Sequence, residues 1–126
     1  MDTTDPAAAR AWPGLEVFDE EGDRIGRLIG IYADPSTGRP VFGLVRTGLF
    51  GLRSVLVPLV HAFEEGGALI VTCQKRTIKS APHLRRDEPL SEETERELYA
   101  HYGLDRESDR RLELLEPEPA GRIRRG

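Results

Sequence analysis

The sequence predicts a mainly β protein: a small, mostly antiparallel β-barrel with one C-terminal helix and flexible ends. Five or six short segments read as strands, and turns rich in glycine and proline separate them. A single later segment, at about residues 91–102, has helical periodicity. Short strands at this spacing, with little helix between them, are typical of small barrels and sandwiches.

The predicted strands follow one another between clear turn signals. They are Leu15–Asp19, Ile25–Asp34, Val41–Thr47, Ser54–Val60 and Ala68–Cys73. Strict alternation in the second strand places Ile25 and Ile31 on one face and Leu28 on the other. The same strand contains Gly26 and Gly30, which suit a bend or a close backbone approach, as at a barrel corner.

The helix has start and stop signals of its own. Ser91 is a good N-cap, and Glu92 and Glu93 lie where the helix dipole favours negative charge. Gly103 is suited to a left-handed C-cap. We expect this helix to lie across the barrel or to contact a partner.

Both ends of the chain are expected to be flexible. Residues 1–11 are polar and alanine-rich. Residues 105–126 hold six acidic residues and six arginines with few apolar side chains, so they bury too little surface to offset the entropy of ordering. The ordered domain is therefore expected over residues 12–104.

Composition excludes several classes of protein. The chain has 126 residues and a formal net charge of -4, so bulk charge does not favour polyanions. No apolar run is long enough for a transmembrane helix, and the first residues do not look like a secretory signal. The lone Cys73 cannot form an internal disulfide, and a cytoplasmic location is expected.

No pattern in the sequence indicates catalysis. His61, His83 and His101 have no metal-ligand spacing with one another or with Cys73, which is expected to be a buried, unreactive thiol. Nucleophile elbows and phosphate-binding glycine loops are also missing. We expect no enzymatic activity, no cofactor and no metal. A barrel this small is normally filled by its own side chains, so no small-molecule substrate is expected either.

A series of short motifs resembles a known family. The motifs are Val17–Asp19, Gly22–Arg27, Tyr32–Asp34, Thr37–Pro40, Arg46–Gly51, Val57–Leu59, Lys75, Ile78–Pro82, Leu90–Glu93, Glu97–Tyr99 and Tyr102–Leu104. In this order, over residues 14–104, they resemble a stand-alone bacterial PRC-barrel domain. The resemblance implies a small, mostly antiparallel barrel that acts by contacting a larger assembly. Related barrels occur in the photosynthetic reaction-centre H subunit and in a ribosomal small-subunit maturation factor, but neither specific function is carried over.

Two apolar features are candidates for a protein interface. Leu49 and Phe50 lie between glycines, where they either contact a partner or a second copy, or Phe50 folds back to plug the barrel. Tyr99 and Tyr102 either seal the core beneath the helix or share in a dimer interface. The primary hypothesis is therefore a non-enzymatic interaction or assembly module whose partner is a protein, a homodimer being one option.

A basic run supports the alternative hypothesis. It consists of Lys75, Arg76, Lys79, Arg85 and Arg86. The run is either a solvated connector or a contact site for RNA phosphates or an acidic protein. In the second case the chain is an RNA- or ribosome-associated factor. No aromatic residue for base stacking lies within the run, which weakens the case for RNA.

Overall fold

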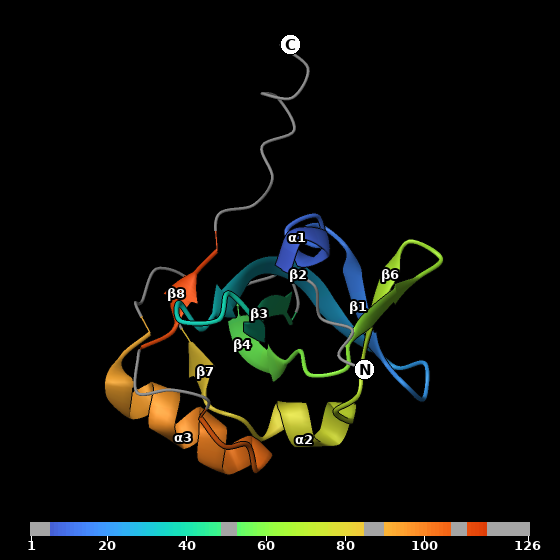
Figure 1. Cartoon of the computed structure of the whole chain (residues 1–126). Helices are drawn as coiled ribbons and strands as arrows, with labels where there is room; N and C mark the ends of the chain where they lie inside the picture. The colour runs from blue at the N-terminus through green and yellow to red at the C-terminus, as the bar shows by residue number, and fades with distance from the viewer. Residues whose placement is uncertain (1–5, 49–52, 85–89, 107–110, 116–126) are drawn as a thin grey trace.

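A single sheet forms the centre of the computed structural model (Figure 1), which describes residues 6–48, 53–84, 90–106 and 111–115. Its strands are β1 (Glu16–Asp19), β2 (Arg24–Ala33), β3 (Pro40–Thr47), β4 (Arg53–Pro58), β5 (Phe63–Glu65), β6 (Ala68–Val71), β7 (His83–Leu84) and β8 (Glu113–Leu114). The helices are α1 (Pro6–Ala9), α2 (Lys75–Lys79) and α3 (Glu92–Tyr102). The prediction of a mainly β fold is confirmed.

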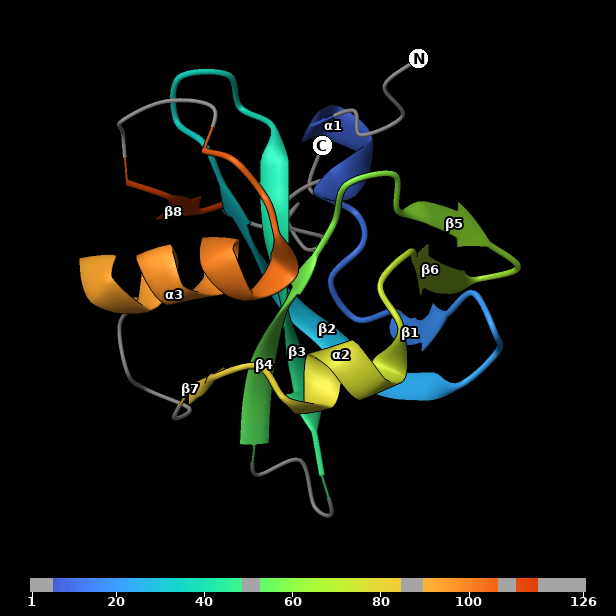
Figure 2. The same cartoon turned by 90° about the horizontal axis from the view of Figure 1, so that it is seen from below.

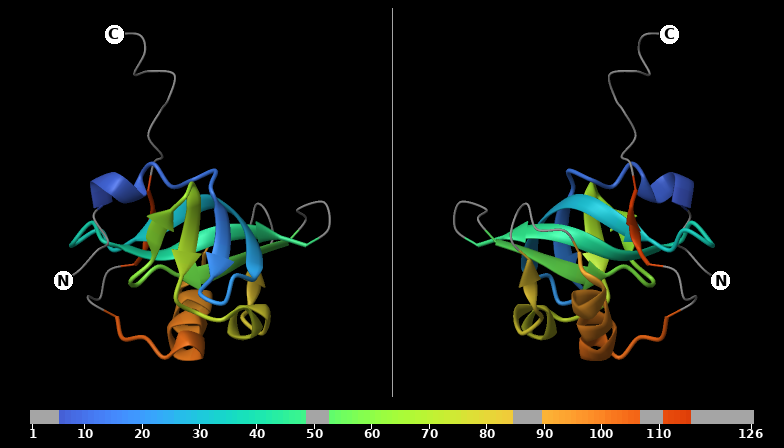
Figure 3. Two further views of the ribbon diagram at one scale, coloured as in Figure 1. Left: turned by 90° about the vertical axis from the view of Figure 1, so that its right-hand side faces the viewer. Right: turned by 90° about the vertical axis from the view of Figure 1, so that its left-hand side faces the viewer.

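The strands are hydrogen-bonded in the order β5-β6-β1-β2-β3-β4-β7, and β8 pairs with β2. The pairings are antiparallel except that between β1 and β6, which is parallel. The described hydrogen-bonded path ends at β5 on one side and at β7 on the other. Figure 3 shows the sheet curling about its own inner face.

The inner face of the curled sheet is filled by apolar side chains. Val17 of β1, Leu28 of β2, Val55 of β4 and Leu69 of β6 are at most 1% exposed and belong to one cluster. Burial of apolar surface stabilises a fold by roughly 25 cal/mol per Å². This cluster is therefore the main source of stability, and it lies on the inner face of the curled sheet.

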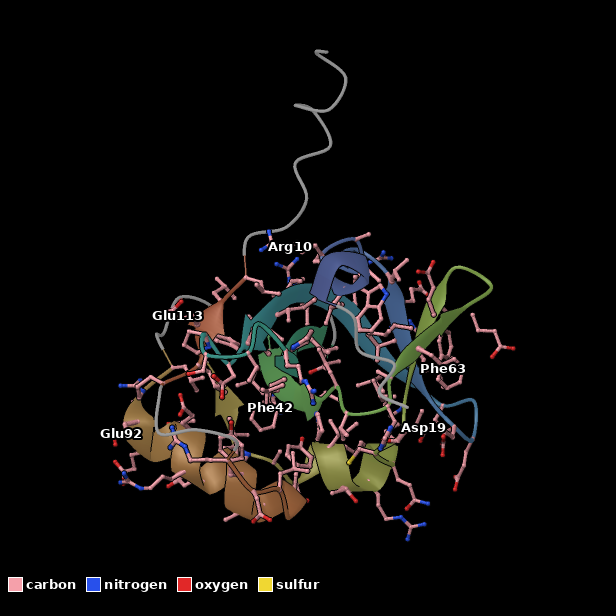
Figure 4. All side chains as sticks on the ribbon, in the orientation of Figure 1. Arg10, Asp19, Phe42, Phe63, Glu92 and Glu113 are labelled. Atoms are coloured by element: carbon pink, nitrogen blue, oxygen red, sulfur yellow. The ribbon has the colours of Figure 1, made fainter. Side chains whose placement is uncertain are left out.

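A second core lies on the side of β3 and β4 that faces away from the inner core, where α3 covers these two strands. Phe42 and Leu56 are fully buried there beneath Leu98 and Tyr99 of the helix. The rings of Phe42 and Tyr99 meet edge to face, with centroids 5.4 Å apart. Figure 4 shows Phe42 between the sheet and α3. Because α3 covers these strands, β4 is buried on both sides, and its sequence from Val55 to Pro58 is therefore continuously apolar.

The face assignment within β2 was wrong. Leu28 and Ile31 both belong to the inner core, although strict alternation places them on opposite faces. The register with β3 shifts between Leu28 and Gly30, so an extra residue separates the two positions. Such a bulge returns the next apolar side chain to the same face. The expected close approach is present at Gly26, where an added Cβ would lie 2.2 Å from the carbonyl oxygen of Arg46.

The ends of the chain are more ordered than expected. Residues 6–9 form α1, and Ala9 joins Trp12 in the inner core, so the flexible segment predicted over residues 1–11 is wrong for residues 6–11. The tail predicted as disordered from residue 105 contains β8, and Leu112 is 7% exposed. Residues 107–110 and 116–126 lie outside the described residues, so the expectation for them stays a prediction.

Candidate interaction face and basic pocket

An apolar row crosses the outer surface of β5, β6 and β1. Phe63 pairs with Ile70, and Ile70 pairs with Phe18. Directly paired residues project on the same side of a sheet, so these three side chains form a row. Phe63 is 40% exposed, and Ile70 and Phe18 are half-buried. Figure 4 shows Phe63 far from Glu92 of α3, at the other end of the molecule.

A charged row runs beside the apolar one. Glu65 pairs with Ala68, Ala68 with Glu16, and Glu16 with Arg27. Arg27 donates one hydrogen bond to the Gly14 carbonyl, at 2.7 Å, and a second to Glu16, at 3.4 Å. The row therefore has an acid at its β5 end and a fixed guanidinium at its β2 end. Together, the two rows are called the outer face below.

A basic pocket lies where α2 meets β2, β3 and β4. Figure 2 shows α2 packed beside these strands. Its volume is about 620 Å³. Four cationic side chains line it: Arg24, Arg53, Lys75 and Lys79. Its described lining contains no acidic side chain. Its apolar floor is formed by Ile25, Val55 and Ile78.

The position of α2 is fixed by a buried carboxylate. Asp19 is 2% exposed and accepts a hydrogen bond from the backbone N–H of Lys75, at 3.0 Å. Its other oxygen accepts the N–H groups of Glu21 and Asp23, at 3.0 and 2.9 Å. Burial alone raises the pKa of Asp19, but these three donors and the Lys75 ammonium outweigh it, so the pKa lies below 3.8.

Asp19 also belongs to the one described group of acids whose geometry could hold a cation. Carboxylate oxygens of Asp19, Glu21 and Asp23 lie within 4.8 Å of one another. However, both oxygens of Asp19 already accept backbone N–H groups. The cluster closes the turn between β1 and β2, with Gly22 at φ 89° supplying the left-handed residue. We assign it this structural role.

Comparison with known families decides the classification. The family described as PRC-barrel domain matches residues 8–77, which include the end of α1, β1 to β6 and the start of α2. The chain belongs to the PRC-barrel domain family. A search of curated proteins finds no match for it. The sequence resemblance is therefore confirmed, and α3 follows the matched part of this PRC-barrel domain.

The PRC-barrel fold separates the residues of the predicted basic run. Lys75 and Lys79 line the pocket, but Arg76, between them on α2, is exposed and outside the lining. Arg85 and Arg86 lie outside the described residues. Sequence reasoning missed Arg24 and Arg53, which approach the lysines only through the fold. A local charge run cannot reveal such partners.

Of the four residues predicted to form a protein interface, the structure describes only Tyr99 and Tyr102. Leu49 and Phe50 lie outside the described residues. Tyr99 is 8% exposed, and the half-buried Tyr102 donates a hydrogen bond to the Leu56 carbonyl at 2.7 Å. Little of the Tyr99 ring is thus available to a partner of this PRC-barrel domain. Sequence reasoning missed Phe63, because it lies between the predicted strands Ser54–Val60 and Ala68–Cys73.

Cys73 of the PRC-barrel domain has no activating environment. Burial, and then the nearby charge of Asp19, raises the pKa of its thiol above 9.0. A raised pKa disfavours the thiolate, which is the reactive form of cysteine. Among the described residues, no helix combines the length and the apolar character that crossing a membrane would require.

Proposed function

We propose that this PRC-barrel domain is a non-enzymatic assembly module that self-associates through its outer face. The supporting observation is the apolar row of Phe63, Ile70 and Phe18. Exposed apolar rows with charged rims are typical of protein interfaces. Val60 lies nearby: it is 41% exposed, and its carbonyl accepts a hydrogen bond from Thr72, which directly follows β6.

Charge complementarity supports a second copy as the partner. When two outer faces meet about a two-fold axis parallel to the strands, β5 of one copy faces β2 of the other. Glu65 of each copy then meets Arg27 of the other. Because the contact is isologous, this makes two equivalent ion pairs. The apolar rows meet beside the line that joins these two ion pairs. Pairing along the β5 edge is disfavoured, since Glu64 at its centre would face its own copy.

The predicted dimer is weak. The two rows cover only a few side chains, less than the roughly 800 Å² per partner of a standard stable interface. We expect a dissociation constant of about 10⁻⁵ to 10⁻⁴ M. Sedimentation should therefore show a weight-average mass that rises with protein concentration across this range.

Two variants test the position of the interface. Phe63→Ser should weaken self-association by about tenfold or more, because aromatic anchors carry much of the binding energy at interfaces. Leu114→Ser is the matched control, since Leu114 of β8 is 57% exposed but lies off the outer face. An equal effect of both variants, or a monomer at every concentration, would contradict the proposal.

The alternative function, an RNA- or ribosome-associated factor, rests on the basic run. Two of the five residues of that run, Lys75 and Lys79, line the basic pocket. It also adds two arginines that the run does not contain. The binding experiment of the next subsection includes RNA as a separate arm.

A further inference from the structure

We propose that the basic pocket binds a small polyanion whose anionic groups are phosphates. This inference goes beyond self-association, and it concerns a site built from different residues. The pocket gathers Arg24 from β2, Arg53 from β4, and Lys75 and Lys79 from α2. These residues are distant in sequence, so the fold itself brings their charges together.

This concentration of positive charge does not follow from composition. The chain holds 22 acidic and 18 basic residues, yet the described lining of the pocket contains four bases and no acid. Like charges in one pocket repel each other, and an anion relieves that repulsion. Arg24 forms an ion pair with Glu16 at 3.6 Å, between side chains that are 53% and 42% exposed. Screening by water makes such a pair weak.

The backbone beneath the charges is held firmly. Val55 and Ile78 are 1% and 2% exposed and belong to the inner core, and Ile25 is 7% exposed. Asp19 anchors the N–H of Lys75 and therefore the first turn of α2. A pocket with an apolar floor focuses the field of the charges around it. Two arginines add planar guanidinium groups, which bind phosphate oxygens in pairs.

Size and composition favour a small ligand over a nucleic acid chain. The volume of about 620 Å³ lies within the usual range for pockets that bind small molecules. No aromatic side chain is among the described lining residues, so a base would find no stacking surface. The pocket borders the inner core, to which Ile25, Val55 and Ile78 of its lining belong.

Calorimetric titration of the full chain at low salt tests this proposal, with tripolyphosphate as the probe. We expect saturable binding to one site per chain that weakens as salt is added. Lys79→Glu and Arg53→Glu should each weaken binding about tenfold or more, because each reverses a charge in the pocket. Both side chains are exposed, so both variants are expected to fold.

Arg76→Glu is the matched control. It makes the same charge change on the same helix, but Arg76 does not line the pocket. We expect its effect on tripolyphosphate affinity to be about twofold or less. An equal loss in the control and the pocket variants would overturn the proposal, because it would indicate a diffuse electrostatic effect.

A second arm titrates a single-stranded uridine oligonucleotide. The proposal predicts that it binds more weakly than tripolyphosphate. Binding of the oligonucleotide without saturable binding of tripolyphosphate would overturn the proposal and support the RNA hypothesis. Absence of saturable tripolyphosphate binding at about 10 mM would also overturn it, because affinities weaker than that are non-specific.

Discussion

The carboxylate of Glu95 accepts a hydrogen bond from the backbone N–H of Leu112 at 3.0 Å, which ties α3 to the C-terminal segment. Glu95 is fully buried, and Leu112 is 7% exposed in the core beneath the helix. Arg106 and Arg111 also bond to this carboxylate. Arg111 in turn donates to the Leu90 carbonyl at 2.6 Å. One buried acid thus organises the segment that leads into β8.

We predict that Glu95→Ala destabilises the fold by roughly 2 to 4 kcal/mol, because it removes the carboxylate that two guanidinium groups and a buried N–H share. Urea unfolding measures the loss. Limited proteolysis should also cut the segment around Leu112 faster. Glu97→Ala is the control, since Glu97 is exposed on the same helix. Equal unfolding curves for the two variants would contradict this role of Glu95.

Replacing Gly26 by any residue with a side chain is predicted to destabilise the fold. A Cβ at this position would meet the Arg46 carbonyl oxygen at 2.2 Å and a Val45 methyl at 2.9 Å. Since the nearer atom is backbone of the neighbouring strand, Gly26→Ala should destabilise the fold by roughly 1 to 3 kcal/mol. Thermal unfolding measures this.

Gly30→Ala in the same strand is the comparison. The nearest atom to its added Cβ is the end of the Leu114 side chain at 3.2 Å, and that side chain is flexible and 57% exposed. Leu114 can move aside, so this variant should unfold close to the wild type. A larger loss of thermal stability in Gly30→Ala than in Gly26→Ala would contradict the close approach of Gly26 to the Arg46 carbonyl.

Stability is predicted to fall on acidification through Asp19. Its pKa is lower in the folded chain than in the unfolded one, where it is about 3.9. The contribution of the charged form is therefore complete above the unfolded-state pKa. It is lost as pH falls toward and through the lower folded-state pKa. Asp19→Asn should thus be less stable than the wild type at pH 7, and the gap should narrow below about pH 4.

Urea unfolding from pH 7 to pH 2.5 measures that gap. Glu20→Gln is the control, because Glu20 is exposed in the same turn. This substitution removes the same charge as Asp19→Asn but disrupts none of the Asp19 hydrogen bonds. A gap between Asp19→Asn and the wild type that is independent of pH would exclude the ionised carboxylate as its cause.

Five of the eight described strands, β1 to β4 and β6, could be predicted because their information is local. In β1, alternation places Val17 inward and Phe18 outward, and a turn with Gly22 follows. The bulge in β2 could not be predicted, because it depends on how the strand pairs with β3. The five-residue α2 has one buried apolar residue, Ile78, and therefore no periodicity to detect.

The candidate sites could be predicted only in part, for the same reason. Lys75 and Lys79 form a local run, but Arg53 joins them only when β4 pairs beside β3 and α2 packs on the barrel. The outer face depends on two pairings of β6, one parallel to β1 and one antiparallel to β5. The anchoring by Glu95 joins residues 17 apart in a segment whose composition suggested disorder.

A charge exchange across the predicted dimer gives the most direct test of self-association. Glu65→Arg places an arginine at both ends of the charged row, and Arg27→Glu places a glutamate at both ends. Each variant alone should repel its own copy, whereas a mixture of the two restores both ion pairs. Circular dichroism first checks that each variant is folded, because Arg27 also bonds to Gly14.

Sedimentation velocity of the two variants, separately and mixed in equal amounts, is the decisive measurement. We predict monomers for each variant alone and a dimer for the mixture, at concentrations where the wild type dimerises. A mixture that stays monomeric while the wild type dimerises would show that Glu65 and Arg27 do not meet across the interface, and would contradict the assigned face.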